Sequence, residues 1–107
     1  MKQIPKPGEV WFADLGYAGK PRWTFVISNP GDGRLAVASV VLVTTQHSGT
    51  PYEITLPRVP WLSEQSYVNA QSIQPVKVTE FTHPARGKFD ERIFKEVKAA
   101  VKLWLAL

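Results

Sequence analysis

The sequence predicts a mainly β fold: an antiparallel, partly closed barrel that carries one helix at its C-terminal end. Nine prolines and seven glycines lie among short apolar runs in a chain of 107 residues. This composition is typical of many strands joined by turns. The one convincing segment with helical periodicity follows Asp90. Because a chain of this length buries one modest hydrophobic core, we expect a single domain over residues 1–107.

The first half of the chain predicts four strands separated by turn signals. They are Val10–Leu15, Trp23–Ser28, Leu35–Thr44 and Tyr52–Leu56. Because successive strand side chains point to opposite faces, Val10 and Phe12 share one face of the first strand. Trp11 and Ala13 share the other. The third strand is rich in valine and alanine without alternation, which indicates burial on both faces.

The second half predicts two more strands and the helix. The strands are Ser66–Ile73 and Val76–Phe81, separated near Pro75 because proline interrupts a ladder of backbone hydrogen bonds. Thr82–Gly87 then leads into the helix as a loop. Asp90 is a good N-cap. The residues after it form an apolar stripe at helical spacing: Ile93, Phe94, Val97, Val101, Trp104 and Leu105.

Composition excludes several classes of site. Cysteine is absent, which excludes disulfides, thiolate metal sites and thiol nucleophiles. His47 and His83 are far apart in sequence with no nearby carboxylate pair, so we expect no metal site and no cofactor. Met1–Pro7 lacks the apolar region of a secretory signal, and no run approaches the ~20 apolar residues that span a bilayer. We therefore expect a cytoplasmic protein without membrane contact.

The charge and two polar strand ends point to an anionic partner. The formal net charge is +4, which favours nucleic acid or an acidic protein segment. Arg22 opens the apolar run that ends at Asn29, and Thr44–Gln46 closes the run that begins at Ser39. A strand end holds its polar side chain rigidly at the rim of a sheet. A guanidinium and a hydroxyl delivered in this way suit a phosphate.

Three further segments complete a recognisable pattern: Pro7–Leu15, Pro51–Leu56 and Ser66–Gln71. In this order and spacing, the five segments resemble the MazF/PemK family of toxin–antitoxin toxins, from about Pro7 to the C-terminus. The resemblance implies an SH3-like barrel with a terminal helix, in agreement with the fold expected from the pattern alone. The family pattern, Arg-Pro followed by an apolar run and later Thr-Thr/Ala-Gln, places the catalytic residues at Arg22 and Thr44.

The resemblance also implies an activity. Members of this family are metal-independent, sequence-selective endoribonucleases that cleave single-stranded RNA and so inhibit translation and growth. The expected protein is a homodimer with RNA across its interface, neutralised by a cognate antitoxin with an acidic tail. In such cleavage the ribose 2′-hydroxyl attacks its own phosphate in line, and donors fixed around the developing charge are the largest catalytic contribution.

Other residues are candidates for accessory roles. His47 has a pKa range suited to proton transfer, and Gln46 lies beside it. Basic side chains would contact phosphates, although each would serve equally as a solubilising charge. Aromatic side chains in loops would stack on unpaired bases, and Trp61 would also anchor the loop Pro57–Leu62. The RNA-binding candidates are Tyr17, Lys20, Trp23, Arg34, Arg58, Trp61 and Gln74.

The sequence departs from the family pattern in two places. Trp23 replaces the usual proline after Arg22. Gln74 stands where a basic residue is usual, and Pro75, which follows it, lacks a backbone donor. This second departure implies weaker phosphate binding, a different target or reduced activity. Two alternatives therefore stay open: a CcdB-like gyrase poison on the same fold, and a non-catalytic or degenerate SH3-like binding module.

Overall fold

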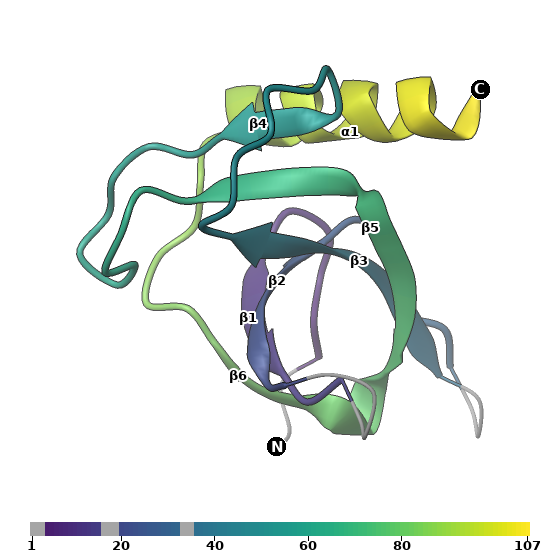
Figure 1. Ribbon diagram of the computed structural model, residues 1–107. Helices are drawn as coiled ribbons and strands as arrows, with labels where there is room; N and C mark the ends of the chain where they lie inside the picture. Colours follow the sequence, from purple (N-terminus) through teal and green to yellow (C-terminus); the bar gives the residue numbers. More distant parts are fainter. Residues whose placement is uncertain (1–3, 16–19, 33–35) are drawn as a thin grey trace.

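The computed structural model describes residues 4–15, 20–32 and 36–107, which form one antiparallel sheet and one α-helix. The strands are β1 (Val10–Ala13), β2 (Arg22–Val26), β3 (Val37–Thr44), β4 (Glu53–Thr55), β5 (Tyr67–Lys77) and β6 (Phe81–Pro84), and the helix is α1 (Glu91–Leu105). The strand order is β4-β5-β3-β2-β1-β6, so β4 and β6 are the edges and the sheet is not closed. The sheet curls strongly, and α1 lies beside β4 and β5 (Figure 1). The mainly β fold with a C-terminal helix is confirmed.

Strand β3 lies between two hydrophobic clusters. Val41 and Val43 belong to the cluster that includes α1, whereas Ala38 and Val40 belong to the cluster inside the curl of the sheet. The expected burial of this strand on both faces is therefore confirmed for its central residues. The β3 residue Leu35 of the prediction lies outside the described part of the chain.

The alternation expected for β1 is also confirmed. Val10 packs in the cluster under α1, whereas Trp11 and Ala13 pack in the cluster inside the curl. Phe12 is only half-buried and pairs with Trp23 of β2 through the ladder between the two strands. This position brings Phe12 to the outer side of the sheet, where the cavity described below opens.

The prediction of two strands separated near Pro75 was wrong. β5 runs without interruption from Tyr67 to Lys77, and Pro75 lies opposite Ser39 of β3. β4 covers the other edge of β5 only as far as Asn69. Beside Pro75 that edge has no partner strand among the described residues. Proline lacks a backbone N–H, but no strand is there to accept a hydrogen bond from one.

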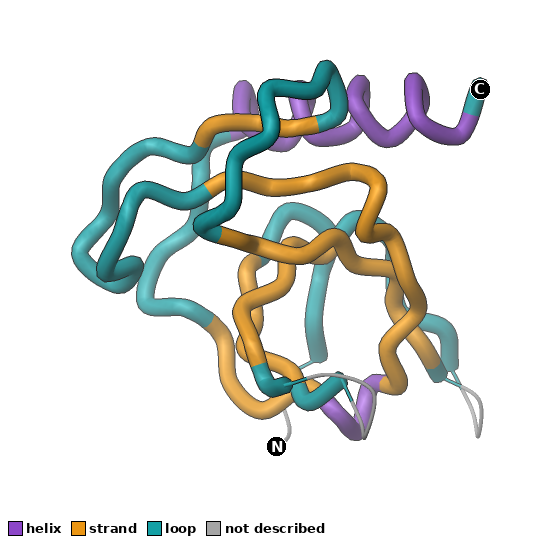
Figure 2. The backbone as a smooth tube through the Cα atoms, in the orientation of Figure 1, coloured by secondary structure: helices purple, strands orange, loops and turns teal. Residues whose placement is uncertain are grey.

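The prediction of a loop over Thr82–Gly87 was wrong for Thr82–Pro84, which belong to strand β6. A single 3₁₀ turn, η2 (Val78–Glu80), ends β5, and β6 then pairs antiparallel with β1. The Thr82 hydroxyl donates a hydrogen bond of 2.9 Å to the carbonyl oxygen of Phe12, which ties the two strands together. Figure 2 shows the remaining loop segment rising from β6 to the start of α1.

The helix begins at the expected cap. The Asp90 side chain accepts a hydrogen bond of 3.2 Å from the backbone N–H of Ile93. Ile93, Val97 and Val101 are buried against the sheet, and full burial of such side chains contributes ~1.5–3 kcal/mol each. At the end of the expected stripe, Trp104 and Leu105 are 41% and 43% exposed. No helix in the described residues is long and apolar enough to cross a bilayer.

Candidate active site

Arg22 and Thr44 line the same open cavity, which has a volume of about 350 Å³. Arg22 begins β2 and Thr44 ends β3, and these strands are antiparallel neighbours. Thr24 lies opposite Leu42, so continuing this register by two residues sets Arg22 opposite Thr44. The remaining lining residues are Phe12, Pro21, Trp23, Val43, Thr45, Trp61, Leu62, Ser63, Glu64 and Ser66.

The Arg22 guanidinium has unused hydrogen-bonding capacity. Its Nε is buried and has no hydrogen-bond partner. No ion pair joins Arg22 to a carboxylate within the described part of the chain. A buried donor left unpaired costs ~1–3 kcal/mol. The side chain is therefore held at the cavity at some cost, with its planar donor fork available to an anion.

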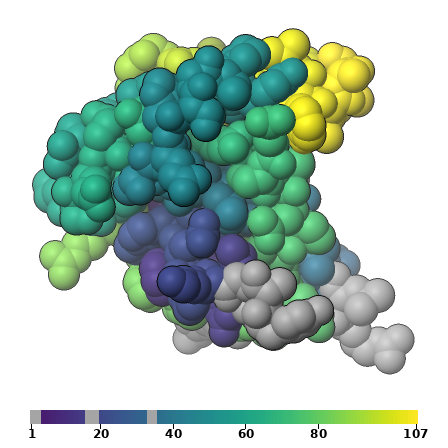
Figure 3. All heavy atoms as spheres, in the orientation of Figure 1, coloured from purple at the N-terminus to yellow at the C-terminus, as the bar shows by residue number. Residues whose placement is uncertain are grey.

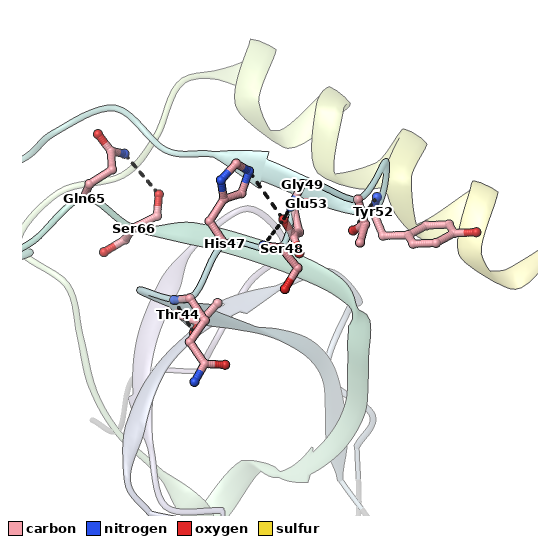
Figure 4. Close-up of polar contacts among 10 residues, drawn as sticks. Thr44, His47, Ser48, Gly49, Tyr52, Glu53, Gln65 and Ser66 are labelled. Atoms are coloured by element: carbon pink, nitrogen blue, oxygen red, sulfur yellow. Dashed lines mark hydrogen bonds and ion pairs between the residues drawn. The ribbon is translucent and has the colours of Figure 1, made fainter.

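The Thr44 hydroxyl is oriented by the chain that follows it. Its Oγ1 accepts a hydrogen bond of 3.1 Å from the backbone N–H of Gln46 (Figure 4). This contact uses the oxygen as an acceptor, so the hydroxyl proton is left to donate to another group. Gln46 thus contributes through its backbone, while its exposed side chain is not among the residues that line the cavity.

His47 is not among the residues that line this cavity. Its ring stacks on Tyr67 with centroids 4.4 Å apart, and its Nε2 lies 3.5 Å from Oε1 of Glu53. The Glu53 carboxylate also accepts backbone hydrogen bonds from Ser48 and Gly49 (Figure 4). Although it follows Thr44 closely in sequence, His47 fastens the loop between β3 and β4.

The electrostatic environment of Glu53 favours its ionised form. Burial alone raises the pKa of this carboxyl, because desolvation penalises its charge. Backbone hydrogen bonds from Ser48, Gly49 and Thr50, with a smaller contribution from the charge of His47, outweigh burial and hold the pKa below its ordinary value. The carboxylate is thus the fixed centre to which the loop between β3 and β4 is attached.

Two tryptophans that were RNA-binding candidates come together at the cavity. Trp23 and Trp61 are in edge contact, with ring centroids 5.7 Å apart, and both line the cavity. Trp61 also packs on Phe89 at 5.4 Å, which anchors its loop as expected. Trp23 contacts Phe12 at 5.2 Å. The result is an aromatic wall beside Arg22 and Thr44.

The other RNA-binding candidates that the structure describes do not line this cavity. Lys20 is exposed and is not among the lining residues. Arg58 is exposed and donates a hydrogen bond of 3.4 Å to the carbonyl oxygen of Ser63, so it braces a loop. Gln74 lines a separate cavity of about 250 Å³. Tyr17 and Arg34 fall outside the described residues.

Sequence reasoning found Trp61 in the loop between β4 and β5 but missed the polar residues of the same loop. This loop places Ser63, Glu64 and Ser66 at the cavity, and its residues form a lobe next to β1 and β2 (Figure 3). Glu64 is the only carboxylate among the lining residues. No short motif marks it, because about twenty residues separate it from Thr44 and the curl of the sheet brings them together. Across the described residues, no group of three or more His, Cys, Asp or Glu side chains is placed to hold a metal ion.

The chain is similar in structure to several solved proteins. An endoribonuclease from a mycobacterial species, solved in complex with its cognate antitoxin, shares 24% sequence identity, with a TM-score of 0.79 and 96% of each chain covered. MazF from Deinococcus radiodurans shares 19% identity, with a TM-score of 0.75 over 99% of this chain and all of the other. A MazE–MazF complex from the same organism shares 20%, with a TM-score of 0.70 over 99% of both chains. At these identities the likeness establishes the fold.

A comparison with models of protein families identifies the family as well as the fold. No curated protein sequence matches this chain significantly. A family model described as PemK-like, MazF-like toxin of type II toxin–antitoxin system matches residues 6–105. This match spans nearly the whole chain and confirms the resemblance found in the five sequence segments. The chain therefore belongs to the PemK-like, MazF-like family of toxins of type II toxin–antitoxin systems.

Proposed function

We propose that this protein is a metal-independent endoribonuclease that cleaves single-stranded RNA selectively in the cytoplasm and so inhibits translation and growth. The observation that carries the proposal is the shared cavity, in which a guanidinium with a buried, unpartnered Nε lies with an oriented hydroxyl. Membership of the toxin family supports it.

The chemistry follows from these two groups. A scissile phosphate in the cavity accepts hydrogen bonds from the Arg22 guanidinium and the Thr44 hydroxyl. As the ribose 2′-oxygen attacks phosphorus, negative charge grows on the phosphoryl oxygens, and both donors stabilise it. A preorganised donor of this kind contributes roughly 10²–10³-fold in rate. A guanidinium carries five N–H donors and no acceptor, so Arg22 acts as a donor and not as the base.

The aromatic wall supplies a place for bases. Trp23 and Trp61 both line the cavity, and an aromatic ring accepts an unpaired base by stacking, with ~1–3 kcal/mol per base. A base held in a duplex is already stacked on its neighbours, so this arrangement favours single-stranded RNA. Sequence selectivity then depends on the shape of the loops around the cavity.

The partners follow from the family and the charge. We assign a homodimer with RNA across its interface, and a cognate antitoxin whose acidic tail competes for the same basic surface. Two of the similar structures were solved with an antitoxin, one mycobacterial and one from Deinococcus radiodurans. The net charge of +4 suits both an RNA strand and an acidic segment.

Cleavage of single-stranded RNA in excess EDTA tests the proposal. The wild type should cleave, whereas Arg22→Ala and Thr44→Ala should lose activity by about 10²-fold or more. Arg92→Ala and Thr79→Ala change exposed residues outside the cavity and serve as matched controls that should cleave normally. An inactive wild type, or full activity in both cavity variants, would contradict the proposal.

A further inference from the structure

The active-site cavity contains a carboxylate that can accept a proton and is not engaged in holding the fold together. Glu64 lines the cavity with Arg22 and Thr44, and its side chain is exposed. Its carboxylate has no hydrogen bond or ion pair with any residue that the structure describes. Arginine and threonine are poor proton acceptors at neutral pH, whereas an ionised carboxylate is a competent one.

The loop that carries Glu64 is held in place on both sides. The Gln65 side chain donates hydrogen bonds to the carbonyl oxygens of Leu56, at 2.7 Å, and Ser66, at 3.2 Å, the second of which is drawn in Figure 4. The Ser66 hydroxyl donates to the Glu64 carbonyl oxygen at 3.0 Å. Leu62, near the start of this segment, is buried. The backbone of Glu64 is therefore fixed relative to the sheet, as a catalytic group requires.

Glu64 and Arg22 share the cavity without neutralising each other. Arg22 and Glu64 form no ion pair, since every nitrogen of the guanidinium is more than 4.0 Å from the Glu64 carboxylate oxygens. A space between a cation and a carboxylate suits a substrate that offers an anion to one and a proton donor to the other. A phosphodiester with a neighbouring 2′-hydroxyl is such a substrate.

From this arrangement we infer that Glu64 is the general base of the cleavage reaction; the inference rests on the ribonuclease function proposed above. The carboxylate accepts the proton of the 2′-hydroxyl while the 2′-oxygen forms its bond to phosphorus. The bond from phosphorus to the 5′-oxygen breaks, and its electron pair stays on that oxygen, which takes a proton from water at the open mouth of the cavity. Glu64 returns its proton to solvent. The products are a 2′,3′-cyclic phosphate and a 5′-hydroxyl.

A purely electrostatic role for Glu64 would affect RNA binding and not the chemical step. An exposed carboxylate beside an RNA strand repels it, so its removal would tighten binding and leave the chemical step unchanged. The loss of a general base lowers the chemical step by roughly 10²–10⁴-fold. The two roles are thus separated by kcat and KM, measured on the same variant.

The experiment compares wild type, Glu64→Gln and Glu91→Gln in single-turnover cleavage of a single-stranded oligoribonucleotide in EDTA. Glu91 is exposed in the first turn of α1, so its variant is a control for the same change in charge. We expect Glu64→Gln to lower kcat by roughly 10²–10⁴-fold without raising KM. Glu64→Asp, which keeps the carboxylate, should retain part of the activity.

A second substrate distinguishes base from acid. An RNA with sulfur in place of the scissile 5′-oxygen has a leaving group that needs no proton. If Glu64 is the base, the defect of Glu64→Gln persists on this substrate, and its disappearance would overturn the assignment. Wild-type cleavage with Glu64→Gln as active as Glu91→Gln would also overturn it, while the ribonuclease function would stand. A wild type that cleaves no RNA would remove both.

Discussion

Arg22 and Thr44 occupy adjoining ends of two antiparallel strands, and both line one cavity of about 350 Å³. Their separation in sequence is bridged by the pairing of β2 with β3. The cavity they share is completed by the loop between β4 and β5. A local strand pair thus places the two groups that we propose bind phosphate, and a distant loop completes the cavity around them.

The buried, unpartnered Nε of Arg22 should lower the free energy of unfolding of the wild-type protein. We expect Arg22→Met to raise the free energy of unfolding by about 1 kcal/mol, because it removes a buried Nε that lacks a partner. The same variant should lose cleavage by about 10²-fold or more. Urea unfolding monitored by tryptophan fluorescence measures the first effect. Arg92→Met, at an exposed helix position, is the control; a cavity variant less stable than wild type would contradict this expectation.

Glu53 should make stability depend on acidic pH. Its pKa is lowered in the folded state, so its contribution is present above the unfolded value and is lost as pH falls through the folded one. The loss should therefore occur below about 4.5, its ordinary value. In Glu53→Gln, acid unfolding should lack this component, because the amide cannot carry the charge that Ser48 and Gly49 stabilise. Identical acid unfolding curves for the two proteins would refute this role.

Trp61 should contribute to RNA affinity through stacking. We expect Trp61→Ala to weaken binding of single-stranded RNA by roughly 5- to 150-fold, since a base–aromatic contact is worth ~1–3 kcal/mol. Trp61→Phe should retain most of the affinity. Fluorescence anisotropy in the slowly cleaving Thr44→Ala background measures both. Trp104→Ala removes a tryptophan that does not line the cavity and should bind normally; equal affinity for Trp61→Ala would argue against stacking.

The C-terminal end of α1 distinguishes the ribonuclease from a gyrase poison. Trp104 makes an edge contact with Tyr52 at 5.2 Å, whereas Leu103 and Leu107 are 57% and 83% exposed. Deletion of residues 104–107 should lower the free energy of unfolding by about 0.5–1.5 kcal/mol, the value of an aromatic pair, while RNA cleavage persists. A poison of the CcdB kind would lose its protein target instead. Growth arrest lost with cleavage intact would favour that second reading.

The sequence predicted the elements whose signals are local. The Asp90 cap and the polar ends of β2 and β3 depend on neighbouring residues, and the structure has them as expected. The course of β5 through Pro75 was not predictable in this way, because it depends on where β4 ends beside it. The position of Glu64 at the cavity depends on the curl of the whole sheet. His47 shows the converse: it is close to Thr44 in sequence, yet it is not among the residues that line the cavity.

The central claim is that Arg22 and Thr44 act together on one phosphate. Single-turnover cleavage in EDTA by wild type, Arg22→Ala, Thr44→Val and the double variant tests it most directly. Groups that act as a unit are strongly non-additive, so the double variant should be about as slow as the slower single variant. Losses that multiply in the double variant, or wild-type rates in either single variant, would contradict the shared phosphate site.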